Sequence, residues 1–281
     1  MLRALSATAA LVLAGVGVAW AATHGEKPEA YPFSFESPLG SYDMAAVQRG
    51  FQVYNQVCAN CHSMNHLAYR HLGEEGGPFA LYMVQNEESH EMEPHVGRPE
   101  HGGTFVEVTD NPYVRAIAQS HMITDVDPTS GQPTDRPGRI SDHFRRPYPN
   151  EIAARASNGG AAPPDLSVIT SARHGGARYV RSLLMGYTGE TEGTLHHNPY
   201  FPGGRLAMPP PLADGAVPYA DANTPQTVAQ YATDVATFLQ WSADPHMEQR
   251  KRLGIVVLAF LVALAGLLFL AYKQVWRGES H

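Results

Sequence analysis

The longest uninterrupted hydrophobic run of this chain lies close to its C-terminal end, over residues 253–272. The run carries no charged residue and is bounded by Arg252 and Lys273. As a helix it rises about 30 Å, the thickness of a bilayer core. A buried core helix of this length normally carries a polar stripe, and this segment has none. Tyr272 and Trp276 suit the interfacial belt of a membrane. The pattern therefore predicts a transmembrane anchor.

Two amphipathic helices are predicted in the chain that precedes this anchor. In the first, over residues 43–64, apolar residues recur at steps of four and three. These residues are Val47, Phe51, Tyr54, Cys58 and Cys61. Both cysteines therefore belong to the buried stripe of the helix. The second helix is predicted to begin at Thr224 and Pro225, an N-cap followed by proline at the first helical position, and to end at Asp244.

The N-terminus has the pattern of a secretory signal. Residues 1–3 provide a positive start, residues 4–18 are small and apolar, and residues 19–21 form an Ala-Trp-Ala cleavage site. An uncleaved N-terminal anchor is the alternative. Cleavable export favours a bacterial source. It predicts a single-pass protein of a bacterial inner membrane, with residues 22–247 in the periplasm and a tail over residues 273–281 in the cytoplasm.

Composition distinguishes one stretch of the exported region from the rest. Residues 73–139 are rich in glutamate and also contain His90, His95 and His101. We interpret this stretch as an acidic surface insertion with at most short helices. A metal site is the alternative, but no ligand spacing of the His-x-x-x-His kind is present. The net charge of −7 argues against nucleic-acid binding and is compatible with a basic protein partner. The abundant proline and glycine favour few helices and much irregular chain.

The strongest chemical signal is Cys58-Ala59-Asn60-Cys61-His62, the C-x-x-C-H motif that attaches a c-type haem. Two thiols at this spacing can each add to a vinyl group of one porphyrin, and the histidine becomes the proximal ligand of the iron. The chain has two cysteines, both inside the motif, so no structural disulfide competes for them. A chance match and a dithiol redox pair are the alternatives. The single motif predicts one covalently bound haem c.

The second axial ligand is expected among the remaining methionines and histidines. Met208 is followed by three prolines, which hold a loop extended and rigid and suit the presentation of one thioether. Met185 better fits a methionine packed in the core, and Met64 is too close to His62 to reach the opposite haem face. A His62/Met208 pair fills both axial positions and raises the reduction potential. The sequence therefore predicts electron transfer.

Several longer motifs resemble those of the cytochrome c1 family. They are RGFQVY (49–54), CANCHSM (58–64), YPNE (148–151), NGGAAPPDLS (158–167), ARHGG (172–176), NPYFPG (198–203), the Met208-Pro-Pro loop and FLQW (238–241). The resemblance follows nearly the whole chain in order, and the insertion is its least matched part. It implies a mostly α-helical fold with much irregular chain. The expected architecture is a class I cytochrome c-like haem domain with a long insertion, followed by one C-terminal transmembrane helix.

The resemblance also implies roles for individual residues. The thioether links fall on Cys58 and Cys61, and the axial positions on His62 and Met208. Pro163 or Pro164 would offer a backbone carbonyl to the free ring nitrogen of the ligating histidine. Three further residues are implied in the pocket of the haem propionates: Arg173, Tyr179 and Asn158. Arg173 and Tyr179 match propionate-binding positions, whereas Asn158 lies in the segment that lines the pocket. A surface arginine beside a glycine turn is the alternative for Arg173.

The function implied by this resemblance is that of the haem-bearing electron carrier of the cytochrome bc1 complex, a quinol-oxidising complex of respiration or photosynthesis. The expected partners are a cytochrome b subunit, a Rieske iron–sulfur protein, a soluble or tethered c-type cytochrome and the lipid bilayer, in a dimeric complex. With both axial positions filled, the chain is not expected to be an enzyme on its own. Two alternatives remain open. One is a tethered cytochrome that feeds a terminal oxidase or reductase, and the other is a haem enzyme such as a peroxidase.

Overall fold

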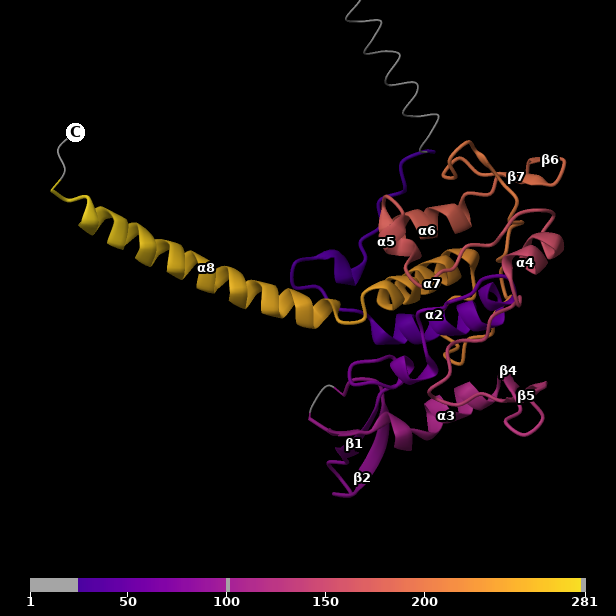
Figure 1. Cartoon of the computed structure of the whole chain (residues 1–281), viewed down its shortest axis with the longest axis horizontal. Coiled ribbons are helices and arrows are strands. Elements are labelled where there is room, and N and C mark those ends of the chain that lie inside the picture. The colour runs from indigo at the N-terminus through magenta and orange to yellow at the C-terminus, as the bar shows by residue number, and fades with distance from the viewer. Residues whose placement is uncertain (1–24, 100–101, 279–281) are drawn as a thin grey trace, which may run out of the picture.

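The computed structural model describes residues 25–99 and 102–278. The predicted signal sequence over residues 1–21 and the last residues of the predicted tail lie outside these described residues. Figure 1 shows a domain built around two adjacent helices, from which a third, long helix extends. The central pair is α2 (Met44–Gln56) and α7 (Val228–Ala243), and the long helix is α8 (Met247–Val275).

The hydrophobic core lies where α2 and α7 pack against each other. The rings of Phe51 and Phe238 meet edge to face with their centroids 5.7 Å apart, a preferred geometry for aromatic pairs. Two shorter helices, α5 (Ile169–Ala172) and α6 (Gly176–Met185), pack on α7. The predicted fold class is confirmed: helices are the main regular elements of the domain, they are joined by much irregular chain, and a C-terminal apolar helix follows.

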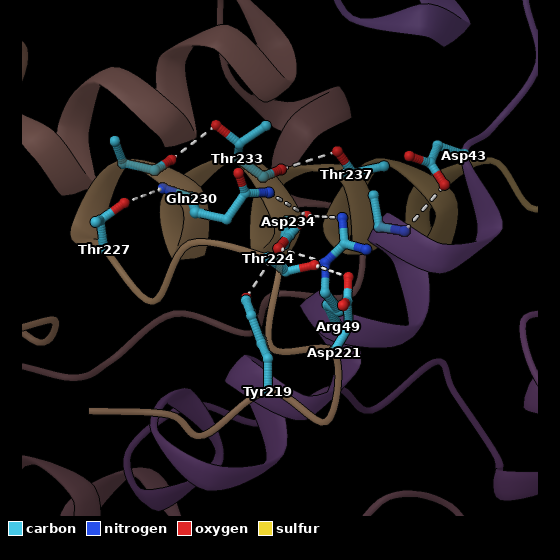
Figure 2. A network of polar contacts seen from close by, with 12 residues as sticks. Asp43, Arg49, Tyr219, Asp221, Thr224, Thr227, Gln230, Thr233, Asp234 and Thr237 are labelled. Carbon is cyan, nitrogen blue, oxygen red and sulfur yellow. Dashed lines mark hydrogen bonds and ion pairs between the residues drawn. The ribbon is translucent and has the colours of Figure 1, made fainter. Parts of the chain in front are cut away.

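A buried ion pair joins the same two helices. Figure 2 shows Arg49 of α2 reaching toward Asp234 of α7, and both carboxylate oxygens accept guanidinium N–H groups at 2.9 Å. Asp234 is fully buried, and it also accepts hydrogen bonds from the Tyr219 hydroxyl at 2.8 Å and from Gln230 at 3.0 Å. A buried carboxylate is stable when it is paired and its remaining lone pairs are satisfied. The ion pair therefore fixes the position of α2 relative to α7 along their shared interface.

Both predicted amphipathic helices form, but each is shorter than expected. The first ends at Gln56, and the haem-attachment motif lies in a separate 3₁₀ turn, η2 (Cys58–Asn60). The prediction of one helix to residue 64 was wrong because the turn tightens there: the N–H groups of Cys61 and His62 both bond to the carbonyl of Cys58. Cys58 still packs against the core, although neither cysteine is part of α2.

The second helix begins three residues later than predicted. Its N-cap is Thr227, whose hydroxyl accepts the N–H of Gln230 at 3.3 Å. Thr224 instead donates to Asp221 at 2.7 Å within a turn. Two threonines near the helix start offered the same capping chemistry, and the turn at Asp221 decides which of them is used. The predicted end is confirmed, since Asp244 caps α7.

The insertion contains two small antiparallel sheets that the sequence did not predict. The first has the strand order β2-β1-β3 and the second is a hairpin. Their strands are β1 (Leu81–Gln85), β2 (Met92–Val96), β3 (Thr104–Val106), β4 (Met122–Val126) and β5 (Pro133–Pro137). The helical parts of the insertion are short, as predicted: η4 (Val108–Asp110) and α3 (Pro112–Gln119) lie between the sheets. A further short helix, η3 (Tyr69–Leu72), ends just before the insertion.

The remaining elements are short. They are η1 (Ser34–Glu36), α4 (Glu151–Ser157), β6 (Thr191–Glu192), β7 (Leu195–His197) and β8 (Arg205–Leu206). The last three form a small antiparallel sheet in the order β6-β7-β8. This sheet leads directly into the loop that carries Met208.

Helix α8 contains the predicted anchor and extends beyond it at both ends. It is long and apolar enough to cross a membrane, and its apolar side chains are exposed. Its first turn belongs to the domain instead. Met247 is buried, Glu248 accepts from Arg98 at 2.7 Å and from the N–H of Tyr42 at 3.1 Å, and Lys251 donates to the Ser37 carbonyl at 2.8 Å.

Candidate haem-binding site

The two cysteines of the motif are free thiols on the turn that follows α2. Burial, followed by the neighbouring Cys61, raises the pKa of the Cys58 thiol to about 12. Dithiol redox proteins work with a thiol whose pKa is lowered, because the thiolate is the nucleophile. The environment of Cys58 therefore disfavours the dithiol interpretation.

The imidazole of His62 is oriented by a backbone carbonyl. Its Nδ1 lies 2.8 Å from the carbonyl oxygen of Pro164. A carbonyl oxygen accepts hydrogen bonds and cannot donate, so Nδ1 carries the proton and Nε2 is left free for a metal. Of the two prolines implied by the resemblance, Pro164 makes this contact. Pro163 lies one peptide further away.

The protonation state of His62 also favours metal binding. Burial lowers the pKa of this histidine, while the Pro164 carbonyl and the charge of Asp165 act in the opposite direction. Because the net shift is downward, the ring is neutral at neutral pH. Neutral imidazole is the form that binds metals.

Backbone hydrogen bonds join the segment after His62 to the segment after Pro164. The N–H of Leu166 donates to the carbonyl of Ser63 at 2.9 Å, although the two residues are about a hundred positions apart in sequence. Leu166 is buried in the core. The histidine and the carbonyl that orients it therefore lie on two segments that are hydrogen-bonded directly to each other.

Electrostatic interactions and one hydrogen bond connect the predicted propionate residues with the Met208 loop. Burial raises the pKa of the Tyr179 hydroxyl, and the nearby charge of the Arg173 guanidinium acts in the opposite direction. Burial and then the nearby Tyr179 raise the pKa of Tyr187. The hydroxyl of Tyr187 donates to the carbonyl of Met208 at 3.1 Å. Tyr187 is a neighbour of the Met208 loop that the sequence analysis missed, because no motif or spacing distinguishes it from the other tyrosines.

The structure also bears on the predictions for Met185 and Asn158. Met185, which the sequence favoured as a core residue, is 37% exposed at the end of α6, whereas Met64 is fully buried. Helix α6 turns its last residue outward, a detail that the apolar neighbours of Met185 do not reveal. The Asn158 side chain donates to the Ala154 carbonyl at 2.7 Å and thereby caps the C-terminal end of α4.

The residues at this site fit a c-type haem. The turn offers two free thiols and a neutral imidazole with Nε2 available, and Met208 is a half-buried thioether in a proline-rich loop. Imidazole and thioether are a known axial pair for haem iron. Within residues 25–99 and 102–278, no group of three or more His, Cys, Asp or Glu side chains is placed to hold a metal ion.

Comparison with known proteins gives consistent matches. Residues 33–279 match a family model described as the Cytochrome C1 family. The chain is 41% identical to "Cytochrome b/c1" of Bradyrhizobium diazoefficiens over 99% of its own length and spans 39% of that relative. It is 42% identical to "Cytochrome c1-2, heme protein, mitochondrial" of Solanum tuberosum, with 94% of this chain and 90% of the relative covered. Identity to "Cytochrome c1, heme protein, mitochondrial" of Saccharomyces cerevisiae is 40%, over 92% of this chain and 75% of that one.

Proposed function

Because this chain belongs to the cytochrome c1 family, the haem subunit of the cytochrome bc1 complex, we propose that it accepts one electron from a Rieske iron–sulfur protein and passes it to a c-type cytochrome. The observation that carries this proposal is the hydrogen bond from Nδ1 of His62, the histidine of the C-x-x-C-H motif, to the backbone carbonyl of Pro164. It prepares one ring nitrogen for iron beside two free thiols.

When bound, the haem supplies a one-electron couple between ferrous and ferric iron. Cys58 and Cys61 would hold it by thioether links, and His62 and Met208 would bind its iron. One haem per chain follows from the single motif. The Arg173 guanidinium and the Tyr179 hydroxyl, which lie near each other, would hold the propionate side. A charge-assisted bond from a guanidinium to a carboxylate suits that role. Asn158, at the end of α4, would line the same side of the pocket.

With both axial positions occupied by protein, no coordination position is left for oxygen, peroxide or carbon monoxide. The chain accordingly performs electron transfer and is not an enzyme on its own, but acts as a subunit of a ubiquinol:cytochrome c oxidoreductase. This distinguishes it from a peroxidase, which needs an open position. No catalytic acid or nucleophile is required of the domain.

We also propose a placement in the membrane. Residues 1–21 direct export and are removed, residues 22–247 lie in the periplasm, and residues 253–272 span a bacterial inner membrane. The apolar side chains of α8 support this, since exposing them to water costs about 25 cal/mol per Å² of apolar surface. Cytochrome b is the proposed partner within the bilayer, and the name "Cytochrome b/c1" of the Bradyrhizobium relative supports that association.

The test is isolation of the intact complex from membranes. Haem stain should remain on this chain after denaturing electrophoresis, a di-haem cytochrome b and a Rieske protein should co-purify, and quinol should reduce added cytochrome c. Loss of stain from a Cys58→Ala, Cys61→Ala double variant would confirm attachment at these thiols. Co-purification with a terminal oxidase, in place of cytochrome b and the Rieske protein, would establish the alternative carrier function.

A further inference from the structure

The carboxylate of Asp165 joins the two chain segments that meet at His62. Its Oδ2 accepts the Ser63 hydroxyl at 2.9 Å and the N–H of Asn65 at 2.7 Å. Its Oδ1 accepts the N–H of Ser167 at 2.9 Å. One side chain therefore holds the residue that directly follows the histidine and the loop that presents the orienting carbonyl.

Ser167 connects this arrangement to the core of the domain. Its hydroxyl accepts the N–H of His66 at 3.1 Å, and its carbonyl accepts the hydroxyl of Ser242, from α7, at 2.8 Å. Ser167 is fully buried. The loop that carries Asp165 is thus fixed relative to α7, and α7 packs against α2.

We propose that Asp165 is a positioning residue that holds the Pro164 carbonyl against Nδ1 of His62, and that it thereby sets the orientation of the axial imidazole and the reduction potential of the iron. This inference rests on the proposed function, since it requires haem at His62. Asp165 acts at a distance from the ring. The pyrrolidine ring fixes φ of Pro164, so the direction of its carbonyl depends on the following peptide, which Asp165 anchors.

The charge of Asp165 has a second effect on the same site. Burial acts to raise the pKa of this carboxyl, but hydrogen bonds from Ser167, Asn65 and Ser63 hold it below its ordinary value. The group is therefore ionised at neutral pH. A negative charge in the surroundings of the iron stabilises the ferric state relative to the ferrous state. Removing that charge should raise the reduction potential.

The experiment compares Asp165→Asn with Asp165→Ala in the full-length holoprotein. Asparagine keeps the shape and one acceptor oxygen but removes the charge, whereas alanine removes the acceptors as well. Haem content, the midpoint potential and the g values of the ferric low-spin signal, which depend on the orientation of the axial ligands, are measured for each variant. We expect both variants to have a raised potential. The g values should stay close to wild type in the asparagine variant and should shift or broaden in the alanine variant.

Asp142→Asn is the matched control, because Asp142 is also a paired carboxylate, held by the Arg136 guanidinium. It should leave the potential and the g values unchanged. A wild-type protein without haem would overturn the proposed function itself. Wild-type protein with haem, but with the same potential and g values in both Asp165 variants, would overturn the positioning role alone. If the alanine variant retains no haem, the asparagine variant decides, and an unaltered potential there refutes the inference.

Discussion

Gly50 of α2 lies so close to Asp234 of α7 that a Cβ at position 50 would be 2.6 Å from the carbonyl carbon of Asp234. The same Cβ would be 2.7 Å from the Cβ of Phe238. Both neighbours are parts of a packed helix and cannot move independently. The absence of a side chain at position 50 therefore sets the distance between the two central helices.

Substitution of Gly50 by alanine should accordingly force the helices apart and destabilise the domain. Overpacking of a filled core costs about 1–3 kcal/mol, and here the obstacle is backbone, so we expect the upper part of this range or more. Urea denaturation of the holoprotein measures the change. Gly254→Ala is the control, since nothing lies within 4 Å of that position. Equal destabilisation by both substitutions would contradict the close-packing explanation.

The buried ion pair predicts a loss of stability of about 3–5 kcal/mol for Arg49→Met alone, because the Asp234 carboxylate stays buried without its cation. The double variant Arg49→Met, Asp234→Leu removes both charges and should recover much of the loss. Chemical denaturation of the double variant and of each of the two single variants gives the coupling between the residues. Additive single effects would show that the pair does not act as a unit.

The pairing of Asp142 with Arg136 predicts a dependence of stability on pH. The Arg136 guanidinium, opposed by burial, lowers the pKa of Asp142 in the folded protein. A lowered folded-state pKa stabilises the fold at pH values above the ordinary aspartate pKa of about 3.9, and this contribution is lost as the pH falls through the folded value. Arg136→Gln should therefore be less stable than wild type at pH 7, and the difference should shrink toward pH 3.

Denaturation curves at both pH values measure this difference. Arg155→Gln serves as the control, because the pair of Arg155 with Glu151 is solvent-exposed on both sides. Such pairs contribute little to stability. A difference between wild type and Arg136→Gln that stays constant from pH 7 to pH 3 would exclude the ion pair as its source.

Replacement of Met208 by leucine tests the proposed sixth ligand. Haem should remain attached, because the thioether links and His62 are unchanged, but the potential should fall since a soft thioether favours ferrous iron. Each fall of about 59 mV corresponds to about 1.4 kcal/mol for one electron. The reduced variant should bind carbon monoxide, and quinol:cytochrome c turnover should collapse. Met185→Leu, at the exposed end of α6, should behave as wild type.

If the Met208→Leu protein keeps its potential and does not bind carbon monoxide, the ligand is another residue. The potential and the carbon monoxide spectrum of Met185→Leu then become the deciding measurements.

The exposed glutamates at the tip of the β1–β2 hairpin predict a salt-dependent encounter with a basic cytochrome c. They are Glu87, Glu88, Glu91 and Glu93, all exposed. Reversal of their charges should slow bimolecular electron transfer at low ionic strength by about tenfold or more, and the difference should vanish as salt screens it. Stopped-flow kinetics over a range of salt concentrations measures the effect. Unchanged rates at low salt would make the hairpin a structural or subunit-contact element.

The sequence by itself determined the parts of this protein whose information is local. The C-x-x-C-H motif predicts covalent haem binding because two thiols and an imidazole must lie close together in the sequence, at a fixed spacing, to reach one porphyrin. The apolar helix that contains residues 253–272 could be recognised because length and composition decide whether a helix can span a bilayer. The two central helices were recognisable from their periodic apolar positions, although their boundaries shifted by several residues.

Tertiary structure decided whatever depends on contacts between distant segments. The choice of Pro164 over Pro163, and the role of Asp165, arise from hydrogen bonds between residues about a hundred positions apart. No local pattern encodes such a pairing, because it exists only when α2 and α7 bring the two loops together. The same holds for the ion pair of Arg49 with Asp234, since a motif shows that a charge is present but not which buried carboxylate it meets.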